Sequence, residues 1–244
     1  MIKLKDLSIK IKGTQKLILS NINLAIPQES VTYLLGPNGA GKSALLHTIM
    51  GSPLFEVSKG QIILDKHNIE SFPPEARAKS GLFLTWQEPI GIPGLKTFNY
   101  LFSIYKARDE KRKDLTETDF SKLLKKYTKE LEIPPTLLQK DLFIGLSGGE
   151  KKKIEVLAML LLKPKIIMLD ELDSGLDIDS EKFLFNKIKA YYKEHKATLI
   201  VVSHGFRVTN YLAPEYVVVL ENGQVKKTGD DSLLEQVKKT GFNI

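Results

Sequence analysis

The chain has 244 residues, of which 42% are hydrophobic and 27% charged, so it is long enough to bury one substantial core and too apolar for wholesale disorder. It contains no cysteine, which excludes disulfides, thiolate metal sites and cysteine nucleophiles. The net charge is +7, but the basic residues are spread along the chain and mixed with acids, which favours a solvated surface over a nucleic-acid site. No apolar run approaches the ~20 residues of a membrane span, and the first residues do not resemble a targeting segment, so a cytoplasmic location is expected.

The hydrophobic pattern along the chain predicts an α/β fold, because short apolar runs alternate with segments of helical spacing. In chain order we expect short strands within 1–35, a helix at 43–50, a strand and turn at 60–72, helical spacing from about 96 to 140, an apolar helix at 154–162, buried strands at 166–169 and 198–202, and a hairpin at 216–224. The helical part, approximately residues 90–160, is expected as a subdomain inserted within a single domain of residues 1–244.

The first chemical motif is a glycine-rich loop between a strand and a helix. It fits the pattern G-x-x-x-x-G-K-[ST] and consists of Gly36, Pro37, Asn38, Gly39, Ala40, Gly41, Lys42 and Ser43. Glycines let successive backbone N–H groups face a phosphate, and the helix N-terminus adds partial positive charge. Lys42 would reach the β- and γ-phosphates of ATP, and the Ser43 hydroxyl would hold Mg²⁺. This motif therefore predicts an ATP site.

A second motif is a pair of acids, Asp170 and Glu171, at the end of the apolar run 166–169. The carboxyl ends of parallel strands border the crevice in which α/β folds bind ligands. Asp170 is therefore expected to orient Mg²⁺, and Glu171 to accept the proton of the attacking water. Alone the pattern is weak, but together with the glycine-rich loop it becomes specific.

A third motif, Ser147-Gly148-Gly149 followed by a helix from Lys151, predicts a second anion-binding helix start. It lies over a hundred residues from the glycine-rich loop. Since one such loop already cradles a triphosphate, the second site is explicable if it serves the nucleotide of another copy of the chain.

With these motifs in this order, the chain resembles the ATP-binding-cassette (ABC) ATPases along its whole length. The resemblance implies a P-loop NTPase core with an N-terminal antiparallel β subdomain and an inserted α-helical subdomain. It also implies ATP hydrolysis between two copies in an ATP-dependent dimer. Gln87 matches the glutamine that contacts Mg²⁺ and the attacking water, Asp177 the loop that crosses to the partner subunit, and His204 the histidine that steadies the γ-phosphate. The aromatic residue that stacks on adenine in this family, expected near Ile11, is absent.

Within this family the chain resembles the SufC-type ATPases of the SUF iron–sulfur cluster assembly systems. The segments that carry this resemblance are 87–94, 147–153 and 170–179. It implies a partner scaffold of the SufB–SufD type, on which the clusters reside, because a chain without cysteine supplies no thiolate ligands to a cluster. The alternatives are the ATPase subunit of an ABC membrane transporter and, from a different class, a nucleic-acid-associated ABC ATPase. A non-hydrolysing pseudo-ATPase is disfavoured by the complete set of motif residues.

The segment that follows Gln87 is expected to begin as a loop, because Pro89, Gly91, Pro93 and Gly94 interrupt it. Its apolar residues, including Ile90 and Ile92, exceed what one helix face can bury. An apolar loop beside a nucleotide sensor suits the docking of a helix from a scaffold protein.

Overall fold

The computed structural model describes residues 1–203 and 205–244. Its central layer is a six-stranded sheet with the order β12-β11-β3-β10-β9-β6. The strands are β3 (Val31–Leu35), β6 (Leu82–Leu84), β9 (Ile166–Asp170), β10 (Thr198–Val202), β11 (Tyr216–Glu221) and β12 (Gln224–Gly229). All neighbours in this sheet are parallel except β11 and β12, which form the predicted hairpin around Asn222-Gly223.

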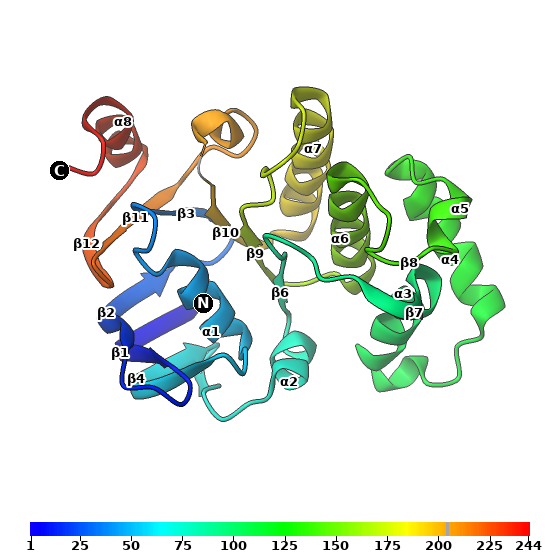
Figure 1. The fold of residues 1–244 in the computed structure, drawn as a ribbon, viewed down its shortest axis with the longest axis horizontal. Helices are drawn as coiled ribbons and strands as arrows, with labels where there is room; N and C mark the ends of the chain where they lie inside the picture. Colours follow the sequence, from blue (N-terminus) through cyan, green and yellow to red (C-terminus); the bar gives the residue numbers. More distant parts are fainter. Residues whose placement is uncertain (204) are drawn as a thin grey trace.

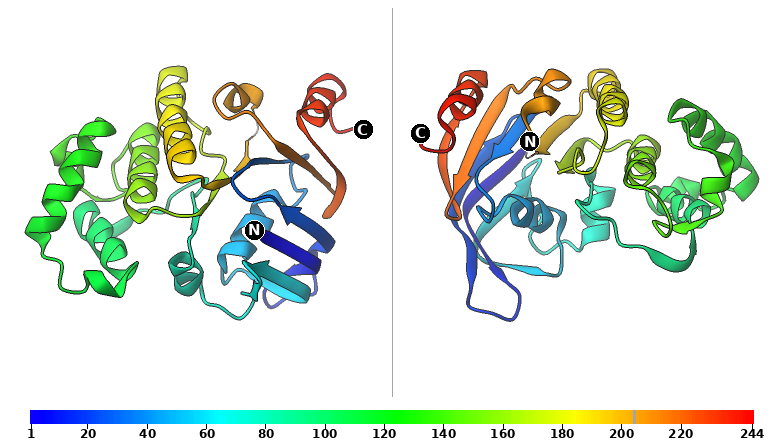
Figure 2. Two further views of the ribbon diagram at one scale, coloured as in Figure 1. Left: turned by 180° about the vertical axis from the view of Figure 1, so that it is seen from behind. Right: turned by 45° about the horizontal axis from the view of Figure 1, so that its top comes forward.

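A second, antiparallel sheet is built mainly from the N-terminal part of the chain and has the order β2-β1-β4-β5. Its strands are β1 (Ile2–Ile11), β2 (Leu17–Ile26), β4 (Phe55–Leu64) and β5 (His67–Asn68). Figures 1 and 2 place this sheet at one end of the molecule and helices α3–α5 at the opposite end. The predicted α/β fold with an antiparallel β subdomain and an inserted helical subdomain is confirmed.

The helices differ in length and in the layer to which they belong. They are α1 (Lys42–Met50), α2 (Pro74–Lys79), α3 (Thr97–Ala107), α4 (Glu117–Glu130), α5 (Pro135–Leu138), α6 (Gly148–Leu162), α7 (Ile178–His195) and α8 (Asp231–Thr240), with 3₁₀ turns η1 (Glu110–Arg112) and η2 (Phe206–Asn210). Among the residues that the structure describes, none of these helices is both long enough and apolar enough to cross a membrane.

The central sheet separates two hydrophobic cores, and the alternation of side chains along its strands explains how. On β9, Ile167 and Leu169 join the core shared with α6, α7 and α8, whereas Ile166 and Met168 join the core shared with α1 and the antiparallel sheet. Every residue of β9 is therefore buried, as expected for a strand covered on both faces. This double burial fixes the position of the acids that end the strand.

One sequence expectation is wrong in detail. The segment after Gln87 is not a loop throughout, because Ile92–Lys96 forms a short strand, β7, that pairs with β8 (Asp141–Leu142). The Gly94 N–H donates to the Asp141 carboxylate at 2.9 Å, and the Lys96 ammonium contacts the same side chain at 2.7 Å. These interactions join segments about 45 residues apart, so local Pro and Gly content does not predict them.

Candidate functional site

The glycine-rich loop connects β3 to α1, as predicted, and two of its glycines are sterically required. A Cβ on Gly36 would lie 2.2 Å from the Leu220 carbonyl oxygen, and one on Gly41 would lie 2.4 Å from the Leu19 side chain. Gly41 is the N-cap of α1, has φ +98°, and provides no side-chain cap. The first N–H groups of α1 thus face the loop without a side-chain acceptor at the cap, which is the arrangement that binds phosphate.

Lys42, the first residue of α1, folds back over this loop. Its ammonium donates to the Gly36 and Pro37 carbonyl oxygens at 2.8 and 3.1 Å, and the residue is only 7% exposed. Burial lowers the pKa of Lys42, while the nearby carboxylates of Glu171 and Asp170 oppose that shift. A buried cation held by neutral carbonyls at a helix start is suited to receive an anionic phosphate.

Ser43 and Asp170, 127 residues apart in sequence, meet across the site. The Ser43 hydroxyl donates to Asp170 Oδ1 at 2.9 Å, and the Thr85 hydroxyl accepts from the Asp170 N–H at 3.0 Å. Asp170 is fully buried, and its other oxygen, Oδ2, accepts no hydrogen bond from any described residue. His47 Nε2 lies 3.5 Å from that oxygen. A buried, under-satisfied carboxylate oxygen beside a serine hydroxyl matches the hard oxygen donors that Mg²⁺ prefers.

Gln87 and Glu171 also meet, from loops that follow the neighbouring strands β6 and β9. The Gln87 amide donates to Glu171 Oε2 at 2.5 Å. Glu171 has φ +49°, a conformation that is uncommon outside glycine, and its N–H donates to the Val202 carbonyl oxygen. Both residues line a cavity of 710 Å³ together with Lys42 and Ser43. The structure thus gathers the predicted phosphate, metal and proton-transfer residues in one place.

Ser147, Gly148 and Gly149 stand elsewhere, because none of them lines that cavity. Ser147 caps α6: its hydroxyl accepts from the Glu150 N–H, and the Glu150 carboxylate accepts from the Ser147 N–H at 2.7 Å. The latter bond lowers the pKa of Glu150. α6 begins at Gly148, three residues before the expected start, because this capping box organises its first turn.

Asp177 lies with this serine–glycine turn and not with the glycine-rich loop. It caps α7 by accepting from the Ser180 N–H at 2.8 Å, which lowers the pKa of Asp177. The two elements are adjacent, since a Cβ on Gly148 would lie 3.5 Å from the Gly175 carbonyl oxygen. His204, the remaining predicted residue, lies outside the described residues.

A buried ion pair, which the motifs do not predict, connects these two regions. Lys152 and Glu155 of α6 are 3% and 4% exposed and lie 3.2 Å apart. The Lys152 ammonium donates to the Trp86 and Gln87 carbonyl oxygens at 2.5 and 3.0 Å, and Glu155 Oε1 accepts from the Trp86 N–H at 2.6 Å. The available signal was a lone acid, Glu155, inside an otherwise apolar helix. The helix of the serine–glycine turn thereby holds the backbone of Gln87.

Comparison with known proteins agrees with this geometry. The "ABC transporter" family model matches residues 19–174. A protein of Bacillus subtilis (strain 168), "Vegetative protein 296", is 37% identical over 240 residues, covering 98% of this chain and 91% of the relative. The "Probable ATP-dependent transporter SufC" of Escherichia coli (strain K12) is 34% identical over 244 residues, covering 99% and 97%.

The fold is also that of solved cassettes. A dimeric ATP-binding cassette in a post-hydrolysis state, bound to ADP and Pi, superimposes with a TM-score of 0.81 at 22% identity, covering 94% of this chain and 98% of that one. The family match spans more than half of the chain, and the curated relatives match it over nearly their whole length. Such cassettes bind and hydrolyse ATP. The chain belongs to the ATP-binding-cassette family of ATPases.

Proposed function

We propose that this ATPase is the ATP-hydrolysing subunit of a SUF-type iron–sulfur cluster assembly complex in the cytoplasm. Its partner would be a SufB–SufD-type scaffold, whose conformation it changes through ATP-dependent dimerisation. The observation that carries the proposal is the similarity to the E. coli relative named SufC over nearly the full length of both chains. The segments 87–94, 147–153 and 170–179 carry the same resemblance at the residues nearest the chemistry.

In the proposed reaction, Lys42 neutralises the β- and γ-phosphates, and Glu171 accepts the proton of the attacking water. Ser43, Asp170 and Gln87 would hold Mg²⁺, which supplies further charge stabilisation on the phosphates. His204 would contact the γ-phosphate. The buried Asp170 Oδ2, which accepts no hydrogen bond from the described residues, supports a cation at this position.

The proposed dimer follows from the separation of the two anion-binding helix starts. Ser147, Gly148 and Gly149 lie outside the cavity that contains Lys42, so one copy does not place both around one triphosphate. Two copies in head-to-tail contact would complete each site, with Asp177 of one copy near the nucleotide of the other. Closing and opening of this pair would be the mechanical output.

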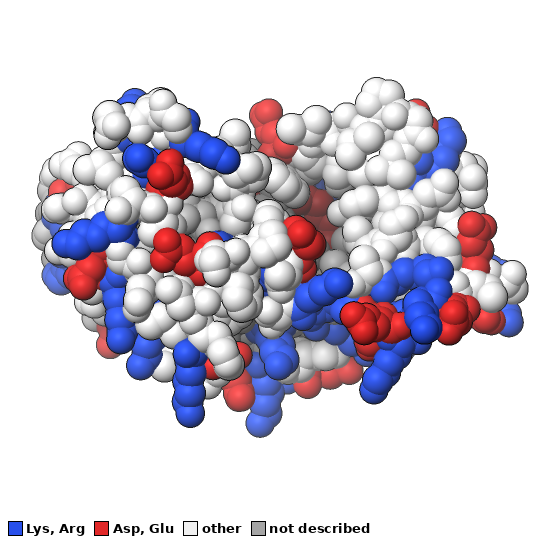
Figure 3. All heavy atoms as spheres, turned by 90° about the horizontal axis from the view of Figure 1, so that it is seen from below, with Lys and Arg blue, Asp and Glu red and all other residues white. Residues whose placement is uncertain are grey.

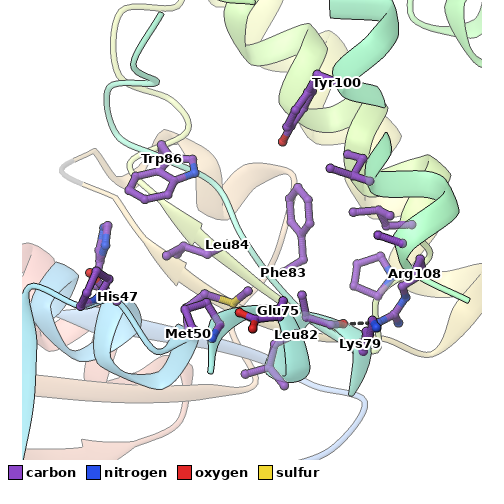
Figure 4. A pocket seen from close by; sticks show the side chains of 18 residues that line it. His47, Met50, Glu75, Lys79, Leu82, Phe83, Leu84, Trp86, Tyr100 and Arg108 are labelled. Carbon is purple, nitrogen blue, oxygen red and sulfur yellow. Dashed lines mark hydrogen bonds between the residues drawn. The ribbon is translucent and has the colours of Figure 1, made fainter. Parts of the chain in front are cut away.

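A docking site for the scaffold is proposed next to Gln87. An apolar cavity of 370 Å³ lies there, between α1 and α2 on one side and α3 on the other. Figure 4 shows Trp86 and His47 at one end of it and Tyr100 and Arg108 at the other, with Leu84 and Phe83 between them. Trp86 is 47% exposed and the nearby Ile90 is 79% exposed, so apolar surface is available to a partner helix.

Several relatives are named as probable ATP-dependent transporters, which favours a second candidate, the ATPase subunit of a membrane transporter. Its chemistry would be identical, and a membrane subunit would occupy the same cavity. A nucleic-acid-associated role receives less support, because on the face shown in Figure 3 the Lys and Arg side chains are interleaved with Asp and Glu.

The test is to recover the unmodified chain from its native cell with the proteins bound to it. Under the SUF proposal, soluble scaffold proteins co-purify, and the captured assembly contains iron and acid-labile sulfide. Recovery only with integral membrane proteins would transfer the assignment to the transporter, while leaving the ATPase chemistry unchanged.

A further inference from the structure

The ATP cavity extends well beyond the phosphate-binding loop. Its lining includes Lys42, Ser43 and Glu171, and also Leu17, Phe55 and the hairpin turn Asn222-Gly223. A triphosphate seated on the loop would contact the first group of residues and leave the second group to the rest of the nucleotide. The base of the same nucleotide therefore has to lie in the part formed by the antiparallel sheet and the hairpin turn.

Phe55 is the only aromatic residue that lines this cavity within the described part of the chain. It is the first residue of β4 and pairs across the antiparallel sheet with Ile11, the last residue of β1. Ile11 is 36% exposed and has no ring on which a base could stack. At this edge of the sheet, the aromatic ring is therefore that of Phe55 on β4, and β1 contributes none.

The surroundings of Phe55 keep its ring in place. It packs partly buried against the core below the antiparallel sheet, and its ring meets His47 of α1 edge-on, with centroids 6.4 Å apart and an interplanar angle of 62°. Because α1 also carries Lys42 and Ser43, the ring and the phosphate-binding groups are positioned by the same helix. A fixed aromatic ring loses little conformational entropy when a base stacks on it.

We propose that Phe55 stacks on the nucleobase of the bound ATP, with the exposed apolar side chain of Leu17 covering the base from another wall of the cavity. Leu17 is 54% exposed and lines the same space. This inference concerns the nucleotide site alone and does not depend on the identity of the partner.

The test compares the affinities of two ligands, Mg·ATP and inorganic tripolyphosphate, by calorimetry. Phe55→Leu keeps the apolar volume but removes the ring, so ATP binding should weaken about 10-fold, within the range found when a base-stacking ring is removed. Tripolyphosphate has no base, and its affinity should stay unchanged. Phe55→Tyr keeps a ring and should bind ATP like the unmodified protein.

Phe72→Leu provides a matched control, because Phe72 is also a partly exposed phenylalanine but does not line the cavity. It should leave both affinities unchanged. Unchanged ATP affinity in Phe55→Leu would overturn the proposal. So would an equal loss for ATP and tripolyphosphate, since Phe55 would then support the phosphate loop and not the base.

Discussion

The Gln87 amide donates a 2.5 Å hydrogen bond to the Glu171 carboxylate, across 84 residues of sequence. This contact joins the segment that follows β6, next to the apolar cavity, to the acid that directly follows β9. An occupant that displaced Gln87 would therefore alter the orientation of Glu171 directly. Under the proposed function, this hydrogen bond would link partner contact to proton transfer.

The first prediction concerns this acid. Glu171→Gln keeps the size and hydrogen-bonding capacity of the side chain but removes its basicity. ATP binding should persist while hydrolysis slows by about 10² to 10⁴, the typical value of a positioned general base. Single-turnover kinetics with pre-bound ATP measure this step, and the exposed Glu235→Gln serves as the control. Normal turnover in Glu171→Gln would mean that another group is the base.

Lys42→Ala removes the buried cation of the phosphate loop. Because charge-assisted hydrogen bonds contribute about 1.5–3 kcal/mol each, Mg·ATP affinity should fall at least about 10-fold. Titration calorimetry measures the affinity, and circular dichroism checks that the fold is retained. Lys59→Ala, on the antiparallel sheet outside the cavity, should bind normally. An unchanged affinity in Lys42→Ala would refute the role of this loop.

The composite site of two copies makes a complementation experiment possible. Subunits with Lys42→Ala and subunits with Ser147→Arg should each be inactive alone. In an equal mixture, half of the dimers pair the two variants and hold one complete site, so ATPase activity should return to at most about a quarter of the wild-type value. If the Ser147→Arg monomer itself lost ATP affinity, the serine would act within its own chain.

Much of the site could be predicted from sequence because its parts are local. The glycine-rich loop is recognised from glycines, a lysine and a serine at fixed spacing. β9 is recognised as a short apolar run that is followed by acids. The fold class follows from the same alternation of strands and helices. Local chemistry and local periodicity suffice for these features.

The remainder depends on contacts between distant segments. The strand pair β7–β8 joins residues that local composition assigns to loops, and β6, three residues long, is too short for periodicity to reveal. α7 and α8 differ from these elements, because an aspartate cap begins each of them and their signal is therefore local. Phe55 becomes part of the ATP cavity only because β4 pairs with β1. Tertiary pairing of this kind leaves no signal in a single sequence.

The buried pair Lys152–Glu155 gives a prediction about stability. Burial raises the pKa of Glu155, and Lys152 opposes that shift. Lys152→Met would leave a buried carboxylate without its cation and free two backbone carbonyls, so the free energy of unfolding should fall by about 3–5 kcal/mol. Glu155→Gln retains an acceptor for the Trp86 N–H and should cost less. Urea unfolding at constant m-value measures the free energy of unfolding of both variants. An equal loss in the two variants, or a larger loss in Glu155→Gln, would contradict the role assigned to the pair.

The last prediction tests the docking surface beside Gln87. Ile90 is 79% exposed, although it follows a segment whose backbone is fixed by Lys152 and Glu155. Because the Ile90 side chain is mostly exposed, it contributes little to the packing of the isolated chain. A charged residue at this position should therefore leave the fold and ATP binding intact.

Ile90→Asp, and equally Ile92→Asp, should therefore abolish co-purification with the scaffold and any stimulation of ATPase activity by it. The physical reason is that a carboxylate would have to be buried without a partner when an apolar helix docks, a cost of several kcal/mol. Leu54→Asp is the control, because Leu54 is 63% exposed but directly precedes β4 and does not belong to the segment that follows Gln87. Pull-down yield and partner-stimulated turnover are measured on the same preparations. Full partner capture by Ile90→Asp would place the docking surface elsewhere. Loss of capture in Leu54→Asp as well would show that the effect arises from added charge and not from this site.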